Sequence, residues 1–321
     1  MATYKEINSA GVQNFSSDPA NPLNGQVWYN TTSSTLKVAE ITTGSGSWAT
    51  GGTLNTARDL LGGAGTQTAG LAFGGREPAN SNATEEYNGS SWTNGGDLST
   101  ARNALAGAGL QTAGLAFGGR EPANSNATEE YNGSSWTNGG NMTTARYNLA
   151  GLGTQTAGLA ATGRTPPGDR QVATEEYNGS SWTNGGNVAT VRNSLAGAGT
   201  QTAGLIFGGN PTQGATEEYD GSSWTNGGQM SQGRYGLAGF GTQTAAAGFG
   251  GESPSGFVAT ELYNGSSWTS GGNMSVARWY LAGCGTTSAG LAFGGGAPSP
   301  MLNVTEEFSG PGTTITTVTT S

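Results

Sequence analysis

The sequence contains no histidine in its 321 residues and only one cysteine, Cys284. The absence of histidine removes the commonest general base and the commonest metal ligand. A single cysteine excludes a disulfide within the chain. No apolar stretch approaches the roughly 18 residues of a membrane-spanning helix, and no charged-then-apolar secretion signal is present. We therefore expect no internal disulfide, no metal, no cofactor and no membrane span.

Charged residues are scarce, at 10% of the chain, and lysine occurs only at Lys5 and Lys37. The net charge is −9, and the sequence has no basic run. A nucleic-acid backbone would find no electrostatic support on such a chain, so we expect no nucleic-acid partner. Solubility must come from Ser, Thr, Asn, Gln and exposed peptide groups. That surface composition is common in extracellular proteins and virion fibres.

Glycine, in contrast, is abundant, with 59 residues. These glycines bring the non-polar share to about half, which is normal for a folded chain. The composition suits tight turns and strands that pack closely through small side chains. Cys284 occupies the variable place of a repeated Gly-x-Gly that elsewhere holds Ala, Leu or Phe. We expect it to be a buried small apolar residue.

A tryptophan is followed ten residues later by an arginine six times, and successive tryptophans are 44, 44, 46, 42 and 44 residues apart. A period in this range, built from short apolar runs and Gly-rich turns, indicates a β-propeller with one four-stranded blade per repeat. We expect these residues to be structural. The six pairs are Trp48/Arg58, Trp92/Arg102, Trp136/Arg146, Trp182/Arg192, Trp224/Arg234 and Trp268/Arg278.

The unit that begins after Arg102 predicts four short strands, at 103–108, 112–118, 127–131 and from Ser135 onward. An Asn-Gly pair joins the last two strands, which is the strongest short-range hairpin signal. Asn-Gly-Ser is also a glycosylation sequon, but its recurrence at a hairpin position favours the turn. Because one blade cannot cover both of its faces, we expect Tyr131 and Trp136 to pack on neighbouring blades.

The order of an apolar strand ending in Gly-Gly, then Glu-Tyr, then Trp and Arg resembles the kelch repeat of β-propellers. Phe73-Gly74-Gly75, Glu86-Tyr87, Trp92 and Arg102 carry this resemblance. It covers about 270 residues and implies an all-β, six-bladed kelch-like β-propeller. The third copy departs from it with Ala161-Thr162-Gly163, which puts that blade's turn in doubt.

The ends of the chain predict how the ring closes. The strand at about 46–52 holds Trp48 and precedes any inner strand, whereas the last repeat ends at Glu307-Phe308 without a tryptophan. We expect the Trp48 strand to complete the C-terminal blade. This gives an N-terminal extension at 1–44, a propeller at 45–310 and a Thr-rich strand or tail at 311–321. Residues 313–320 favour a strand that competes for the same edge or reaches a neighbouring subunit.

Residues 1–44 predict a hairpin, with strands near 25–30 and 35–41 around a Thr-Thr-Ser-Ser turn. The stretch resembles the N-terminal segments of tail-fibre and related virion proteins of marine tailed phages. The resemblance implies that this segment anchors the chain to other virion proteins. A hairpin that only caps the propeller is the structural alternative. The matching residues are Gly25, Trp28, Tyr29, Asn30, Leu36 and Lys37.

The residues offer little support for catalysis. Kelch-like copper oxidases need histidine ligands, which this chain lacks. A sialidase-like enzyme has a tyrosine nucleophile and a cluster of arginines, so its arginines would have to converge on one site. Here the arginines recur at one fixed position, and the Asp-box pattern is missing, so a role in linking blades is favoured. The glutamate pairs, such as Glu129-Glu130, lie on opposite strand faces and cannot converge on one ligand. One glutamate of each pair is expected to pair with the repeated arginine or to cap a turn; cation binding stays open.

The segment after each Gly-Gly turn varies in length and sequence between copies. A constant scaffold with changing loops is how binding surfaces are built. Solvated loops without a ligand are the alternative for any single residue. The predicted ligand-binding residues are Arg76, Glu77, Arg120, Glu121, Arg164, Asp169, Arg170 and Glu252.

Three functional hypotheses follow. The first is a non-enzymatic virion protein of a tailed phage, located in the virion, whose loops bind a host-surface glycan or a neighbouring virion protein. The near-copying of residues 67–96 at 111–140 fits such a recognition module. The second is a bacterial kelch-like adhesin or interaction scaffold. The third is a glycan-processing propeller enzyme. A homo-oligomer is left open.

Overall fold

The computed structural model describes residues 12–19, 26–41, 44–211, 214–252, 257–296, 300–311 and 313–317. The chain forms two compact units, each with its own internal contacts. Unit 1 comprises residues 1–45 and 311–321, and unit 2 comprises residues 46–310. No helix among the described residues has the length and apolarity to cross a bilayer.

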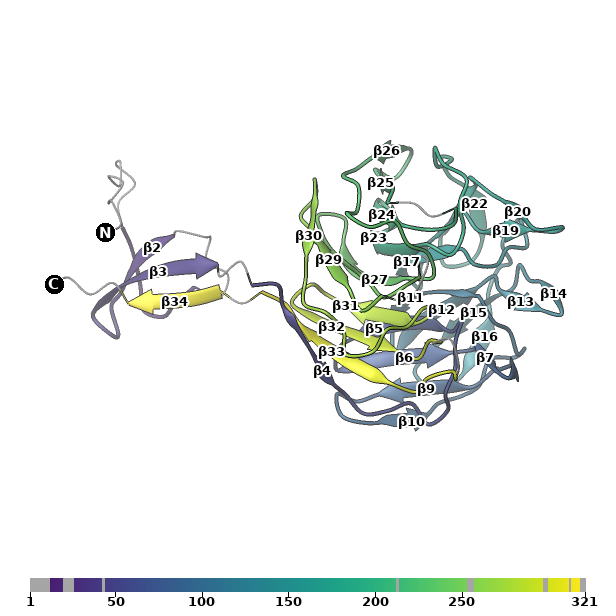
Figure 1. The fold of residues 1–321 in the computed structure, drawn as a ribbon, viewed down its shortest axis with the longest axis horizontal. Coiled ribbons are helices and arrows are strands. Elements are labelled where there is room, and N and C mark those ends of the chain that lie inside the picture. The colour runs from purple at the N-terminus through teal and green to yellow at the C-terminus, as the bar shows by residue number, and fades with distance from the viewer. Residues whose placement is uncertain are drawn as a thin grey trace. The chain divides into compact units, whose positions relative to one another are not determined.

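Unit 2 is a closed ring of six four-stranded antiparallel sheets, seen as blades around an axis in Figure 1. The innermost strands lie next to one another in the cyclic order β5, β11, β17, β23, β27, β31 and back to β5. The N-terminal strand β4 (Ser47–Thr50) pairs with β33 (Thr305–Ser309) and places Trp48 opposite Phe308. The predicted fold, with its closure by the Trp48 strand, is confirmed.

The blades have these strand bounds, from the axis outward. Blade 1 holds β5 (Gly62–Thr66), β6 (Ala69–Phe73), β9 (Thr84–Tyr87) and β10 (Trp92–Asn94). Blade 2 holds β11 (Ala106–Leu110), β12 (Ala113–Phe117), β15 (Thr128–Tyr131) and β16 (Trp136–Asn138). Blade 3 holds β17 (Ala150–Thr154), β18 (Ala157–Ala161), β21 (Thr174–Tyr177) and β22 (Trp182–Asn184).

Blades 4 to 6 complete the ring. Blade 4 holds β23 (Ala196–Thr200), β24 (Ala203–Phe207), β25 (Thr216–Tyr219) and β26 (Trp224–Asn226). Blade 5 holds β27 (Ala238–Thr242), β28 (Ala245–Phe249), β29 (Thr260–Tyr263) and β30 (Trp268–Ser270). Blade 6 holds β31 (Ala282–Gly285), β32 (Ala289–Phe293), β33 and β4. Short two-stranded ribbons extend blades 1 to 3: β7 (Arg76–Glu77) with β8 (Ala79–Asn80), β13 (Arg120–Glu121) with β14 (Ala123–Asn124), and β19 (Arg164–Thr165) with β20 (Asp169–Arg170).

The inner strands approach each other too closely for larger side chains. A methyl group added at Gly107 would lie 2.5 Å from the carbonyl oxygen of Gly63 in the neighbouring blade. Backbone atoms at that distance cannot move aside as a flexible side chain could. The Ala/Gly-rich first strand is therefore a requirement of the axis, as its composition predicts. Cys284 in β31 is buried as expected.

Neighbouring blades are joined by the repeated aromatic residues. Trp136 of blade 2 donates from Nε1 to the Thr84 hydroxyl of blade 1 and packs 4.9 Å, centroid to centroid, from Phe73. The Tyr131 hydroxyl donates to Glu86 of blade 1, and burial, aided by this carboxylate, raises the pKa of Tyr131 to about 12. The expected packing of these aromatics between blades is confirmed.

Each repeated arginine is fully buried and bonds to two blades. The Arg102 backbone N–H donates to Ser81 of blade 1, and its carbonyl accepts from Gly75 of blade 1. Its guanidinium donates to Glu129 of blade 2 at 2.9 Å and to two blade 2 carbonyls. The predicted pairing of one glutamate with the repeated arginine is thus observed, and the same carboxylate also accepts the Ser99 N–H at 2.7 Å. All six arginines have this environment.

Blade 3 keeps its turn despite the altered Gly-Gly motif. Thr162 adopts φ 63°, close to the 66° of Gly118 at the equivalent place in blade 2. The Thr162 hydroxyl is buried and has no hydrogen-bond partner among the described residues. The bond from the next N–H to the repeated arginine carbonyl is 3.3 Å here, against 2.8 Å in blade 2. Leu152 occupies the space that the absent phenylalanine leaves, because it lies beside Gly197, where other blades place a phenylalanine ring.

Thr162→Gly is therefore expected to stabilise the protein by about 1–4 kcal/mol. The change removes a left-handed β-branched residue, which costs about 1–2 kcal/mol, and an unsatisfied buried hydroxyl, which costs about 1–3 kcal/mol. The added freedom of glycine in the unfolded chain offsets about 0.5–1 kcal/mol of this gain. Urea unfolding of the two proteins measures the difference. A variant less stable than the parent would show that Thr162 is accommodated without strain.

Unit 1 is one sheet of strand order β1 (Gln13–Phe15), β2 (Val27–Asn30), β3 (Thr35–Ile41) and β34 (Thr313–Thr317). The predicted hairpin corresponds to β2 and β3. Trp28 is fully buried and, with Asn30, donates to the Asp18 carboxylate, which lowers the pKa of Asp18. The C-terminal strand was predicted to compete for the propeller edge or to reach another subunit. Competition for the propeller edge is wrong, because β34 pairs with β3, an edge that the hairpin would otherwise leave open. Contact with a neighbouring subunit stays a prediction.

Candidate functional site

Within the ring of blades, a ring of backbone hydrogen bonds surrounds the propeller axis. Its residues lie in the sequence shortly before each inner strand. Each N–H in this ring donates to the carbonyl of the equivalent residue in the preceding blade, at 2.7–2.9 Å, and Leu60 bonds to Tyr280 to close the circle. All six residues have positive φ, between 51° and 64°. We call them the inner ring. They are Leu60, Ala104, Asn148, Ser194, Gly236 and Tyr280.

This ring corrects the predicted start of the first strand. The sequence indicates a strand from residue 103, whereas β11 begins at Ala106. Asn103 instead forms an isolated bridge with Arg120, and Ala104 turns into the left-handed region to join the ring. Because each bond of this ring joins a residue to its equivalent in the next blade, the pattern within one repeat does not reveal it.

Two further sets of equivalent residues surround the inner ring. The middle ring precedes it in sequence by one residue, and the outer ring follows the Gly-Gly turns. Within each blade the two sets pair through an isolated β-bridge, so their backbones are alike while their side chains differ. The middle ring is Asp59, Asn103, Tyr147, Asn193, Tyr235 and Trp279. The outer ring is Arg76, Arg120, Arg164, Asn210, Glu252 and Gly296.

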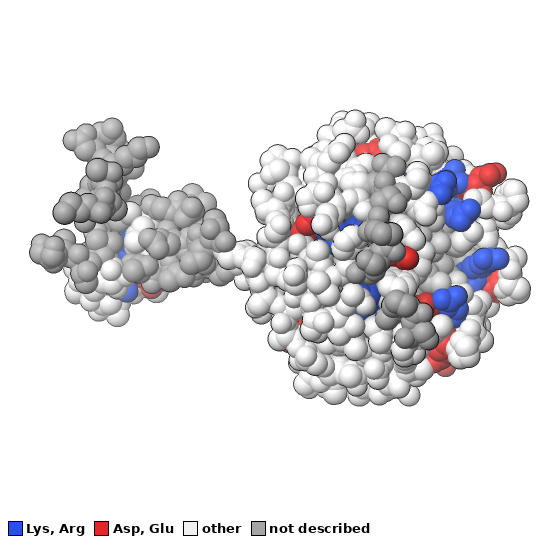
Figure 2. Space-filling model, in the orientation of Figure 1, with Lys and Arg blue, Asp and Glu red and all other residues white. Residues whose placement is uncertain are grey.

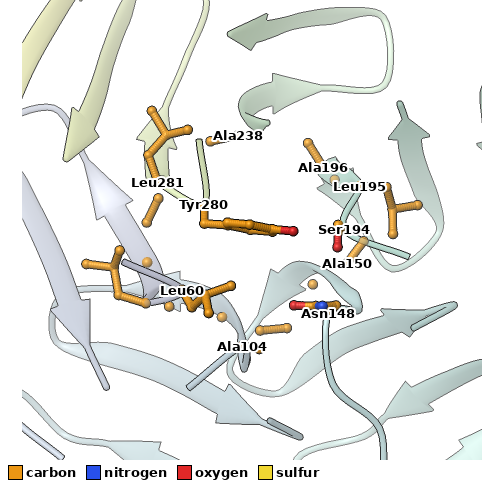
Figure 3. Close-up of a pocket in the computed structure, with 18 of the residues that line it drawn as sticks. Leu60, Ala104, Asn148, Ala150, Ser194, Leu195, Ala196, Ala238, Tyr280 and Leu281 are labelled. Atoms are coloured by element: carbon orange, nitrogen blue, oxygen red, sulfur yellow. The ribbon is translucent and has the colours of Figure 1, made fainter. Parts of the chain in front are cut away.

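A small cavity of about 140 Å³ lies on the axis, lined by the inner ring and by Leu, Ala and Gly residues next to it in the six blades. Figure 3 shows the Tyr280 side chain extending across this cavity, with its hydroxyl toward Ser194. Burial raises the pKa of Tyr280, and a hydrogen bond with Ser194 opposes the shift. The aromatic ring of Tyr280 thus lies across the axial opening.

A larger depression, which we call the groove, crosses blades 1 to 3. It consists of two cavities of about 490 and 240 Å³ that share Arg120, Pro122 and Tyr147. The first is lined by polar and aromatic side chains that include Arg76, Asn80, Asn103, Arg120, Tyr147 and Tyr280. The second extends along Asn124, Thr165, Pro166, Pro167 and Gly168.

Two of the predicted arginines, Arg76 and Arg120, line this groove, and Arg164 approaches it at Tyr147. Arg76 binds both oxygens of Asp59, at 3.0 and 2.7 Å, and this contact raises the pKa of Arg76. The exposed Arg120 guanidinium lies 5.4 Å from the centre of the Tyr147 ring, and that of Arg164 lies 6.0 Å from it. Figure 2 shows basic side chains gathered on the part of this face that holds β13, β14, β19 and β20.

The other predicted site residues are more dispersed. Arg170 is exposed, lines neither cavity and donates to the Asn193 and Asn210 side chains of blade 4, while Asp169 is exposed on the same ribbon as Arg170. Glu77 accepts from Ser81, and neither it nor Glu121 lines the groove. Glu252 is on blade 5 and lines neither cavity; it contacts Tyr235, and its charge also acts on Tyr280. Parts of three predicted loops, at 212–213, 253–256 and 297–299, lie outside the described residues.

Sequence reasoning missed Tyr147 and Tyr280, which provide the aromatic surfaces of the site. A usable signal was present. Between each repeated arginine and the leucine three residues later, two positions change in every copy: Asp-Leu, Asn-Ala, Tyr-Asn, Asn-Ser, Tyr-Gly and Trp-Tyr. These are the middle and inner rings. Because the flanking Arg and Leu are constant and were assigned a structural role, the two variable positions between them were not considered as site residues.

The side chains of the groove offer several kinds of group that can bind a ligand. Guanidinium groups bind anions through charge-assisted hydrogen bonds, side-chain amides donate to and accept from hydroxyls, and tyrosine rings offer flat apolar surfaces. The described residues contain no group of three His, Cys, Asp or Glu side chains placed to hold a metal ion. The glutamates of the repeated pairs are bonded within the scaffold, to arginine on one face and to tyrosine on the other.

Comparison with known proteins supports the fold. No family model and no curated protein matches the sequence. The solved structure of YjhT, a kelch-repeat propeller protein, superimposes with a TM-score of 0.68 over 83% of this chain and 99% of that one, at 12% sequence identity. At that identity the similarity concerns the fold alone. The chain therefore has a kelch-like β-propeller fold, as its repeat predicts.

Proposed function

We propose that this protein is a non-enzymatic binding module of a tailed-phage particle, whose groove binds a host-surface glycan and whose unit 1 attaches the chain to other virion proteins. One observation carries the binding function: six blades keep the same ring of backbone hydrogen bonds while the side chains of the three rings around the axis differ. Binding sites are commonly built in this way, with one backbone scaffold that presents different side chains at equivalent positions.

The composition of the groove supports a glycan. Asn80, Asn103 and Asn148 provide amide donors and acceptors beside the rings of Tyr147 and Tyr280. Sugars present hydroxyls on their edges and apolar C–H groups on their faces, so this mixture of amide and aromatic groups complements them. The assignment to a phage particle has a different basis, namely the resemblance of residues 25–37 to virion segments. There, Trp28 and Asn30 hold Asp18 in a small folded unit.

A glycan array combined with a hydrolysis assay tests the binding function. We expect the purified full-length chain to retain particular glycans without cleaving them. Tyr147→Ala should weaken retention by about two- to tenfold through loss of an aromatic contact. Tyr235→Ala is the matched control, because Tyr235 occupies the same middle-ring position on blade 5, outside the groove. Turnover of a retained glycan would overturn the non-enzymatic assignment, and equal effects of both variants would overturn the site.

The location is tested separately. Mass spectrometry of purified phage particles should detect the chain, and removal of residues 1–44 should abolish its incorporation. Recovery of the chain only from uninfected bacteria would favour a bacterial adhesin or scaffold instead. A neighbouring virion protein that protects the groove from labelling would replace the glycan as the ligand.

A further inference from the structure

The positive charge of unit 2 is distributed unequally around the ring. Six of its arginines are buried in the blades, where each pairs with a glutamate. The remaining four are Arg76, Arg120, Arg164 and Arg170, all from the loops of blades 1 to 3. On blades 4 to 6 the equivalent outer-ring residues are Asn210, Glu252 and Gly296. The same loops carry Glu77, Glu121 and Asp169, but the two cavities of the groove are lined by Arg76 and Arg120 and by no carboxylate of the described residues.

Most of this charge is available to a ligand. Among the described residues, only Arg76 of the four forms an ion pair, with Asp59. Arg164 donates from Nε to the Gly168 carbonyl, and Arg170 donates to two asparagines, so the hydrogen bonds of both arginines go to uncharged groups. The Arg120 guanidinium makes neither a hydrogen bond nor an ion pair within the described residues. The Tyr147 ring lies between Arg120, which lines both cavities of the groove, and Arg164, which lines neither, so Arg120 is the cation at the centre of the groove.

The groove is elongated. Its two cavities join at Arg120, Pro122 and Tyr147, so a ligand can extend from Tyr280 of blade 6 and Arg76 of blade 1 across to Pro167 of blade 3. A single sugar would fill one cavity at most. The arginines recur at equivalent places on consecutive blades, as an extended ligand with a repeating charge would require.

We propose, on the basis of the glycan-binding function above, that the ligand is an acidic polysaccharide carrying a carboxylate on its sugar units. One strand of it lies along the groove. The Arg120 guanidinium binds a carboxylate in a two-pronged hydrogen bond, and the Tyr147 and Tyr280 rings contact sugar faces. Amide groups of Asn80, Asn103 and Asn124 bond to the hydroxyls between the charges.

The same surface is poorly suited to nucleic acid, the other common polyanion. Double-stranded DNA carries one charge per about 1.7 Å of its axis and binds to dense basic surfaces. Here Glu77, Glu121 and Asp169 lie on the same ribbons as the arginines and would repel so dense a charge. A polymer with at most one carboxylate per sugar places its charges far enough apart to avoid them.

Calorimetric titration of the full-length chain tests the proposal with oligogalacturonates, oligomannuronates and hyaluronan fragments of increasing length. The methyl esters of the same oligomers are the neutral controls. We expect the acids to bind at least about tenfold more tightly than their esters, because one charge-assisted hydrogen bond is lost with each ester. Affinity should rise with length until the groove is filled and should fall with added salt.

Variants at equivalent outer-ring positions localise the site. Arg120→Gln should weaken binding of the acid by about tenfold and leave the ester unaffected. Arg120→Lys, which keeps the charge but not the fork, should retain part of the affinity. Glu252→Gln is the matched control on blade 5 and should change nothing.

The outcomes separate this inference from the function on which it rests. If esters bind as tightly as acids, and Tyr147→Ala weakens both, the glycan function stands and the acidic specificity is overturned. If no oligomer tested binds and the glycan array also shows no retention, both proposals fall. Acid binding that is insensitive to Arg120→Gln overturns the site, and tighter binding of a single-stranded DNA oligomer overturns the ligand class.

Discussion

Arg102→Met is expected to lower the free energy of unfolding by about 3–5 kcal/mol, the usual cost of removing one partner from a buried ion pair. Glu129 would stay buried without its cation, and the carbonyls of Gly118 and Ala127 would lose a donor. Burial lowers the pKa of Arg102, and the charge of Glu129 opposes this shift. Chemical denaturation of the purified variant gives the value directly.

Arg120→Met is the matched control for this experiment, because Arg120 is an arginine of the same blade whose side chain is exposed. Its cost should stay within about 0.5 kcal/mol, as for most surface substitutions. The double variant Arg102→Met/Glu129→Met should recover part of the loss, since replacing both members of a buried pair is far less harmful than replacing one. If Arg102→Met cost no more than Arg120→Met, the repeated arginine would have no structural importance.

Removal of β4 should produce the other large effect. A chain that begins at residue 51 leaves β33 without its outer partner and removes Trp48, which packs within 5.0 Å, centroid to centroid, of both Phe249 and Phe308. Loss of a packed tryptophan alone costs about 3–5 kcal/mol. At about 2–4 °C per kcal/mol for a large domain, we expect Tm to fall by about 10 °C or more.

A chain that begins at residue 45 is the control, because it lacks the same extension but keeps β4. By calorimetry, the propeller of this control chain should unfold in one cooperative transition, with a Tm close to that of the propeller in the full-length chain. A synthetic peptide of residues 45–52, added to the shorter chain, should raise its Tm by restoring the strand. Equal Tm values for the two truncated chains would show that the ring does not depend on this closure.

Much of the architecture was predictable because a propeller is built from local units. The Trp-to-Arg spacing, the Asn-Gly hairpins and the alternation in each strand lie within single repeats of about 44 residues. The absence of a tryptophan in the last repeat also predicted the closing strand. The buried Arg102–Glu129 pair could be anticipated because both residues recur at fixed positions, and strand geometry separates adjacent glutamates.

The site was less predictable, because its contacts join residues from different blades. Arg76, Arg120 and Arg164 were identified from loop variation, but nothing in the sequence placed Tyr147 beside two of them. Tyr280 is nearly the whole propeller away from Leu60 in sequence, yet the ring of backbone hydrogen bonds makes them neighbours. The strand pairing of the C-terminal tail was also decided by distance in space, since β34 joins β3 across more than 270 residues of chain.

The repeat, the number of blades and the structural role of the aromatic and arginine positions follow from the amino-acid pattern, because those features depend on hydrogen bonds and packing within one unit or between consecutive units. Where the variable residues meet depends on the folded ring. Closing the ring brings six copies of one position to a common axis, and which side chains then face each other depends on the order of the blades.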